Sequence, residues 1–237
     1  MLNGNDAAGV VMRGAIFDLD GTIVDNMALH AEAFTIFVER HGLRPLTLAD
    51  RRRLDGRRNR DIFPDLFGRP LPEDELRRYA DEKEQLYRDL SAGRLVPVPG
   101  LERLLSILED HGIPVAVATS APRENVAHTL RELQLTDRFG LVARSDEVPR
   151  GKPFPDVFLA AASRLGVPAR GCVAFEDAPT GVAAARAAGM RAVALTTSFP
   201  PEDFAGQPAP PDHAVRDFDE FLAGPGRVWV DGRRHPG

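Results

Sequence analysis

The segment Gly14-Ala15-Ile16-Phe17-Asp18-Leu19-Asp20-Gly21-Thr22 decides the fold of this chain. It begins with a short apolar run typical of a buried strand, and two carboxylates and a glycine follow at once. Alternate residues of an extended segment project to the same side, and Gly21 permits a sharp turn, so Asp18 and Asp20 are predicted to converge. Because open α/β sheets bind ligands at the carboxyl ends of their strands, the segment predicts a ligand site there.

Other short apolar runs, separated by helical patterns, indicate further strands of the same parallel sheet. Strands are predicted over residues 14–17, 115–118, 173–175 and 192–195. Helices are predicted over residues 101–110, 123–133, 154–165 and 181–188, with a last turn at 218–222 after a proline-rich loop. This alternation predicts an α/β fold built on a doubly wound parallel sheet.

The interval from residue 26 to 95 breaks this alternation, because it has helical periodicity and no convincing strand. One apolar stripe at helical spacing predicts core packing and not cofactor contacts: Leu29, Ala33, Phe34, Phe37 and Val38. A second stripe is formed by Leu76, Tyr79, Leu86 and Leu90. We therefore predict a discontinuous α/β core, residues 1–25 and 96–237, with an inserted α-helical cap, residues 26–95.

Composition excludes several classes of protein. The hydrophobic share of 43% and the net charge of −5 indicate an ordinary globular chain without a basic surface for nucleic acid, and no apolar run is long enough for a membrane. Cys172 is the only cysteine, so no intrachain disulfide can form, and its strand context predicts a core residue. Residues 1–11 resemble a frayed leader without a secretory signal, which favours a reducing, cytoplasmic location.

Polar side chains also follow two of the other predicted strands. Thr119 and Ser120 come between a strand and a helix, where a hydroxyl and a backbone amide suit a phosphate oxygen. Glu176 and Asp177 follow the strand at 173–175 and could reach the same edge of the sheet. An aspartate before a proline and a helix can instead be a helix N-cap, so both readings of Asp177 stay open.

In order along the chain, these motifs resemble those of the haloacid dehalogenase (HAD) superfamily, in particular its β-phosphoglucomutase-like branch with a helical cap. Four motifs carry the resemblance over nearly the whole chain: Asp18-Leu19-Asp20-Gly21-Thr22, Ala118-Thr119-Ser120, Gly151-Lys152-Pro153 and Glu176-Asp177. Three of the four lie at the ends of independently predicted strands. The resemblance implies magnesium-dependent phosphoryl transfer through an aspartyl nucleophile.

The roles that the resemblance implies agree with the chemistry of the residue types. Asp18 is expected to attack phosphorus, and Asp20 to protonate the leaving oxygen and then to activate water. Lys152 is expected beside the aspartyl phosphate, where its charge offsets the repulsion between anions. The expected Mg²⁺ ligands are Asp18, Asp20 through its backbone carbonyl, Glu176 and Asp177, since hard oxygen ligands suit this ion.

Further substrate contacts are predicted in the cap and after the second motif. His30 lies twelve positions after Asp18 and matches a histidine of β-phosphoglucomutases that assists the acid/base residue, with a structural role as the alternative. Arg57, Asn59 or Arg60 could meet sugar hydroxyls or a second phosphate. Arg123 is a candidate phosphate contact or a surface residue.

The cap departs from the mutase pattern, which favours a phosphatase. The mutase-like branch carries a lysine before the glycine of this segment, whereas this chain has Asp55 before Gly56. It also has Thr22, which is typical of the phosphatases. We therefore expect a phosphatase of small phosphorylated metabolites such as sugar phosphates, with no nucleic-acid or membrane partner, acting as a monomer or weak homodimer.

Three other functions remain open from the sequence. The first is a β-phosphoglucomutase-type hexose-phosphate mutase, which uses the same motifs. The second is a dehalogenase, against which Asp20, Glu176 and Asp177 argue, since that reaction needs neither a second aspartate nor magnesium. The third is a non-catalytic binding module with the same fold, although all the side chains that the reaction requires are present.

Overall fold

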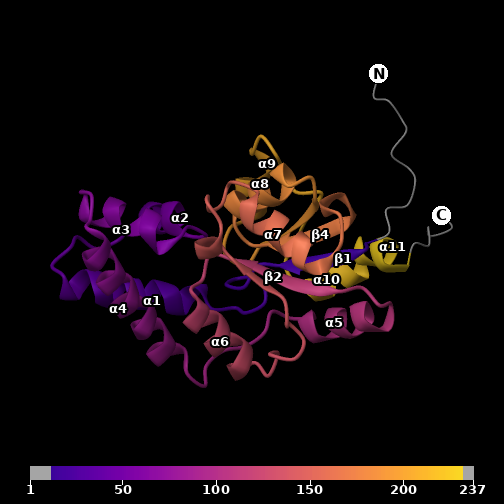
Figure 1. The fold of residues 1–237 in the computed structure, drawn as a ribbon, viewed down its shortest axis with the longest axis horizontal. Coiled ribbons are helices and arrows are strands. Elements are labelled where there is room, and N and C mark those ends of the chain that lie inside the picture. Colours follow the sequence, from indigo (N-terminus) through magenta and orange to yellow (C-terminus); the bar gives the residue numbers. More distant parts are fainter. Residues whose placement is uncertain (1–11, 232–237) are drawn as a thin grey trace.

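The computed structural model describes residues 12–231, and a six-stranded parallel sheet lies at its centre (Figure 1). The strands are β1 (Gly14–Phe17), β2 (Val115–Thr119), β3 (Val142–Arg144), β4 (Cys172–Glu176), β5 (Arg191–Leu195) and β6 (His213–Val215). Their order in the sheet is β3-β2-β1-β4-β5-β6. The predicted α/β fold and four of its strands are confirmed, whereas the edge strands β3 and β6 were not predicted.

Strand order reverses at β1, which pairs with β2 on one side and with β4 on the other. All four residues of β1 are buried, as its apolar sequence predicts. In doubly wound sheets the point of reversal leaves a crevice outside the carboxyl ends of the strands. The residues that follow β1 and β4 therefore face a common space.

Helices cover both faces of the sheet: α5 (Leu101–Asp110), α6 (Arg123–Glu132), α7 (Asp156–Leu165), α8 (Pro179–Ala187), α9 (Pro201–Ala205), α10 (Phe218–Ala223) and α11 (Gly226–Asp231). In Figure 1, α5 and α10 lie on one side of the sheet, and α7, α8 and α9 lie on the other. The sequence analysis missed α9 and α11. A proline is tolerated in the first turn of a helix, and Pro201 occupies that position in α9, so the proline-rich segment is not wholly a loop.

Alternating side chains of the strands divide the core into two layers. Phe17 of β1 and Phe175 of β4 point to one face, where their rings stack at a centroid distance of 4.8 Å. Ile16 and Ala174 point to the opposite face, against α7 and α8. Cys172 is buried there as predicted, and burial raises the pKa of its thiol to about 11, which does not suit a nucleophile at neutral pH.

Four helices occupy the interval that the sequence assigns to a cap: α1 (Met27–Arg40), α2 (Leu48–Leu54), α3 (Asn59–Phe67) and α4 (Glu73–Ser91). We call these helices and their connections, residues 27–91, the helical insert. The apolar stripe of α1 is buried, and the insert has apolar clusters of its own, such as Phe37 with Phe63 and Tyr79. Figure 1 shows the insert beside the sheet, at the far side from α11.

Two predictions concern the chain as a whole. None of the described helices combines the length and the apolar character that crossing a membrane requires. The predicted N-terminal leader, residues 1–11, lies outside the described residues.

Candidate active site

Three buried carboxylates meet where β1 and β4 end. Asp18 comes directly after β1, Glu176 is the last residue of β4, and Asp177 follows it. One carboxylate oxygen from each lies within 4.8 Å of the others. The structure thus brings together two acidic motifs that are far apart in the sequence, because their strands are parallel neighbours.

Lys152 is inserted into this cluster from the loop before α7. Its Nζ donates to Asp18 Oδ1 at 2.6 Å and to Glu176 Oε1 at 2.5 Å. Burial alone would lower the pKa of this lysine, but the two carboxylates outweigh it and raise the pKa above its ordinary value. Lys152 is therefore a fixed positive charge beside the predicted nucleophile.

One lysine leaves three carboxylates with an excess of negative charge. Burial raises the pKa of Asp18 to about 7, in spite of Lys152, and Glu176 adds to this rise. The pKa of Asp177 is raised well above its ordinary value, again by burial and by its acidic neighbours. A bound cation would relieve this repulsion.

The donor set of the cluster fits a magnesium ion. Among residues 12–231, no hydrogen-bond donor reaches Oδ2 of Asp18 or Oδ1 of Asp177. Both oxygens of Glu176 are engaged, one by Lys152 and one by the backbone amide of Ala178 at 2.9 Å. Asp18 and Asp177 therefore offer the available carboxylate oxygens, which are the hard ligands that Mg²⁺ prefers, and Glu176 lies beside them.

Asp177 is not the N-cap of α8, which settles the alternative that the sequence left open. The N-cap is Ala178, and no side chain caps this helix. The Asp177 carboxylate instead accepts a hydrogen bond from the hydroxyl of Ser198, a residue that the sequence analysis did not select.

Asp20 lies apart from the three-carboxylate cluster and is held by α1. Its Oδ1 accepts from Asn26 Nδ2 at 2.6 Å, and His30 Nε2 lies 3.4 Å from the same oxygen. Burial favours a raised pKa for Asp20, but His30, Asn26 and Lys83 outweigh it, and the pKa is lowered. Asp20 is consequently a carboxylate at neutral pH in this state, which is the form of a base.

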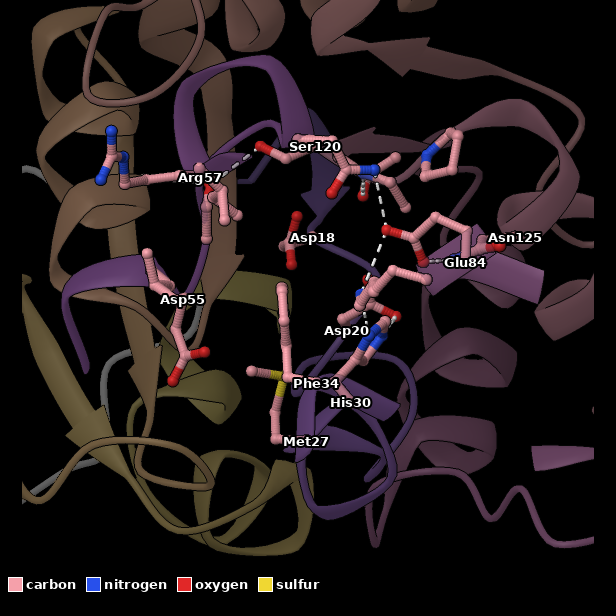
Figure 2. A pocket seen from close by; sticks show the side chains of 18 of the residues that line it. Asp18, Asp20, Met27, His30, Phe34, Asp55, Arg57, Glu84, Ser120 and Asn125 are labelled. Atoms are coloured by element: carbon pink, nitrogen blue, oxygen red, sulfur yellow. Dashed lines mark hydrogen bonds and ion pairs between the residues drawn. The ribbon is translucent and has the colours of Figure 1, made fainter. Parts of the chain in front are cut away.

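His30 connects Asp20 with the helical insert. Its ring stacks on Tyr87 with a centroid distance of 3.8 Å, and its Nδ1 lies 3.0 Å from Nζ of Lys83. The ring is buried in the pocket wall (Figure 2). The structure therefore places His30 beside Asp20, and its assistance to the acid/base residue stays a prediction.

Thr119 and Ser120 line the same pocket from the end of β2. The Thr119 hydroxyl accepts a hydrogen bond from the amide of Ala121 at 3.0 Å. Ser120 Oγ donates to the carbonyl oxygen of Gly56 at 2.9 Å, so its side chain joins the core to the helical insert. Its backbone amide remains the group predicted to meet a phosphate oxygen.

The predicted arginine contacts differ in their placement. Arg57 lines the pocket, but its guanidinium donates to Asp65 at 2.9 Å and to the carbonyl oxygen of Asp61 at 2.6 Å. Figure 2 shows this guanidinium directed away from Asp18. Arg60 and Arg123 are exposed and do not line the pocket. Their positions in this structure therefore give no support to the predicted contacts with substrate.

A polar cluster in the pocket wall joins Asn59, which the sequence analysis selected, to three residues that it missed. Glu84 is buried and accepts from Asn59 at 2.8 Å, from Asn125 at 2.6 Å and from Lys83 at 3.1 Å. Lys83 falls four residues after Tyr79, on the buried stripe of α4. A charged residue on an apolar stripe was the signal that could have identified it.

Gly181 supports the cluster by leaving room for Glu176. A Cβ atom at this position would overlap the Glu176 carboxylate. We expect Gly181→Ala to displace Glu176 from Lys152 and to lower kcat about 10- to 100-fold, because a shift of one ångström at a reacting site has this effect. Steady-state kinetics and thermal unfolding would measure it. Gly140→Ala is the matched control, since nothing lies within 4 Å of its added methyl group, and equal kcat values for both variants would contradict the expectation.

The fold and the acidic site define a class of protein. A sequence model of the haloacid dehalogenase-like hydrolase family matches residues 15–195, which is more than half of the chain. The chain therefore belongs to this family of enzymes, and the resemblance drawn from its motifs is confirmed.

Individual relatives agree with this assignment. A phosphorylated carbohydrates phosphatase of Thermotoga maritima is 33% identical over 186 residues, covering 77% of this chain and 84% of that protein. A β-phosphoglucomutase of Bacillus subtilis is 31% identical over 197 residues, covering 80% and 85%. Among solved structures, a HAD hydrolase of Entamoeba histolytica has a TM-score of 0.80 at 27% identity, covering 88% of this chain and 95% of the other.

Proposed function

We propose that this chain is a magnesium-dependent phosphatase of small phosphorylated metabolites, in particular sugar phosphates, which acts through a phosphoaspartate at Asp18. The observation that carries the proposal is the bridge from Lys152 to Asp18 and Glu176 inside a cluster of three buried carboxylates. The phosphatase activity of the Thermotoga maritima relative on phosphorylated carbohydrates supports the substrate class.

In the first step an oxygen of Asp18 attacks phosphorus, and the bond from phosphorus to the leaving alcohol oxygen breaks. Asp20 donates the proton that this oxygen needs. In the second step Asp20 accepts a proton from water, which attacks the phosphoaspartate, and inorganic phosphate leaves. Asp20 is ionised before substrate arrives, so the negative charge of the bound phosphate has to raise its pKa for the first step.

Other side chains bind and orient the phosphoryl group. Lys152 compensates the charge of the phosphate and the nucleophile, and Thr119 and the Ser120 amide hold phosphate oxygens. Bound Mg²⁺ would neutralise charge on the phosphoryl oxygens. Asp18, Asp177 and the backbone carbonyl of Asp20 would hold it, with Glu176 beside them.

The proposal is tested by measuring phosphate release from sugar phosphates, nucleotides and glycolytic acids, with magnesium and with a chelator. We expect release from at least one sugar phosphate, loss of release with the chelator, and recovery when excess magnesium is added. Turnover that is indifferent to the chelator would contradict the metal assignment. A lack of turnover across the whole panel would instead favour a non-catalytic binding role.

The second candidate is a hexose-phosphate mutase. The 31% sequence identity between this chain and the Bacillus subtilis β-phosphoglucomutase favours it. The two functions differ in where the phosphoryl group goes. Incubation with β-glucose 1-phosphate and a trace of β-glucose 1,6-bisphosphate gives free phosphate from a phosphatase and glucose 6-phosphate from a mutase.

We further propose a cytoplasmic enzyme that is a monomer or a weak homodimer, in which residues 26–95 act as a cap on a core formed by residues 1–25 and 96–237. A single buried cysteine and the net charge of −5 support a reducing compartment without nucleic-acid partners. The position of the pocket between the helical insert and the sheet supports the division. Sedimentation over a range of concentrations tests the oligomeric state.

A further inference from the structure

Asp55 lines the pocket from the turn between α2 and α3, in the helical insert. The residues that would bind the phosphoryl group, such as Asp18 and Ser120, line the pocket from the sheet. Figure 2 shows Asp55 and Glu84 on opposite sides of Asp18 in this view. Asp55 therefore belongs to the part of the pocket wall that would face the alcohol portion of a bound phosphate ester.

The turn that carries Asp55 is fixed against the core. Gly56 has a φ of +77°, its carbonyl oxygen accepts from Ser120 Oγ at 2.9 Å, and its Cα packs closely on the core. A Cβ at Gly56 would lie 3.0 Å from Thr180 Oγ1 and 3.2 Å from the Cβ of Ala178. The position of Asp55 relative to the phosphoryl site is thus set by contacts and not by a flexible loop.

The other charged side chains that the insert contributes to the pocket have close partners. Lys83 contacts Glu84 at 3.1 Å, and Arg57 contacts Asp65 at 2.9 Å. Lys83 also lies 3.0 Å from Nδ1 of His30. These pairs leave little unmet charge on this side of the pocket.

Asp55 differs from these groups. Among residues 12–231 it has no ion-pair partner within 4 Å, and His30, Lys83 and Arg51 act on it only from a greater distance. Burial raises the pKa of its carboxyl to about 6, so the group is mostly ionised at pH 7.5. Of the charged side chains that the insert contributes to this pocket, Asp55 is therefore the one without a partner in direct contact among the described residues.

We propose that Asp55 determines substrate specificity by excluding phosphate esters whose alcohol portion carries a second phosphate or a carboxylate, and by admitting those that carry hydroxyl or ammonium groups. The inference rests on the proposed phosphatase function and adds the charge class of its substrate. A carboxylate only accepts hydrogen bonds, so it can bind a sugar hydroxyl or an ammonium group but repels an anion. Such an uncompensated charge gives specificity by repulsion.

The test compares glucose 1-phosphate with glucose 1,6-bisphosphate, which differ only in the second phosphate. For the wild-type chain we expect kcat/KM for the monophosphate to exceed that for the bisphosphate at least 10-fold. Asp55→Asn keeps the shape of the side chain and removes the charge, and we expect it to narrow this ratio 10-fold or more, mainly through a lower KM for the bisphosphate. Burial of the charged carboxylate is unfavourable, so we expect Asp55→Asn to fold as stably as the wild-type chain. Thermal unfolding of both proteins checks this.

Asp74→Asn is the matched control, because Asp74 is an exposed aspartate in the first turn of α4 that does not line the pocket. It should leave the ratio unchanged. An unchanged ratio in Asp55→Asn would overturn the role of Asp55 while the phosphatase function stands. Equal hydrolysis of both esters by the wild-type chain would do the same. Release of phosphate from neither these esters nor the broader panel would overturn the proposed function, and this inference with it.

Discussion

Asp18→Asn is expected to lower magnesium-dependent phosphate release by about 10⁴-fold or more, since loss of a covalent nucleophile removes the whole reaction path. The amide has the shape of the carboxylate but neither its nucleophilicity nor its charge. Phosphate release from the best substrate of the panel, measured at saturating magnesium, gives the value.

Asp25→Asn is the control for this substitution, because Asp25 is an exposed carboxylate of the same segment that lies outside the acidic cluster. It should retain turnover close to that of the wild-type chain. Unchanged turnover in Asp18→Asn would end the assignment of this residue as the nucleophile.

The second large effect is expected for Lys152→Met, which removes the buried cation of the cluster. We expect kcat to fall about 10²- to 10³-fold, the usual cost of deleting one group that stabilises developing charge. Removing one partner of a buried ion pair also destabilises a protein by about 3–5 kcal/mol. Both losses follow from the contacts of Lys152 with Asp18 and Glu176.

The destabilisation of Lys152→Met should depend on pH in a direction that the structure fixes. The pKa of Asp18 is already raised to about 7, and without the lysine it rises further. At pH 6 the Asp18 carboxyl of the variant is then largely protonated, so its burial costs little stability. At pH 8 a larger fraction of this carboxyl is ionised, and the buried charge has no lysine partner. Thermal unfolding without added metal should therefore show a larger difference from the wild-type chain at pH 8, and a larger difference at pH 6 would contradict this account.

Much of the fold follows from local sequence, because the inner strands are short runs of residues that are nearly all buried. β1, β4 and β5 lie inside the sheet, and only Arg191 at the start of β5 is partly exposed, so neither face of these strands is open to water. The edge strands β3 and β6 were missed because each has only three residues and includes exposed or half-exposed polar positions. Pairing with a neighbouring strand, and not apolar sequence, makes these segments extended.

The candidate site divides in the same way. The four motifs predicted its core-side residues because parallel strands deliver their carboxyl ends to one edge. On the insert side, spacing predicted His30, whereas the placement of Glu84 depends on tertiary contacts such as the hydrogen bond from Asn125, which no local pattern reveals. Arg57 was predicted as a substrate contact from its position in the segment. Its guanidinium instead donates to Asp65 and to the carbonyl oxygen of Asp61, both on α3.

Lysine usage has a practical consequence. Of the 30 lysine and arginine residues, only Lys83 and Lys152 are lysines, and both are buried, with exposed fractions of 3% and 6%. Arginine supplies every other cationic side chain of these two kinds, so the surface over residues 12–231 presents guanidinium groups but hardly any primary amine. Reagents that acylate primary amines should therefore react with residues 12–231 mainly at Lys83 and Lys152. The rate of this reaction reports how often the two buried lysines become exposed to solvent, with almost no background from amines on the surface.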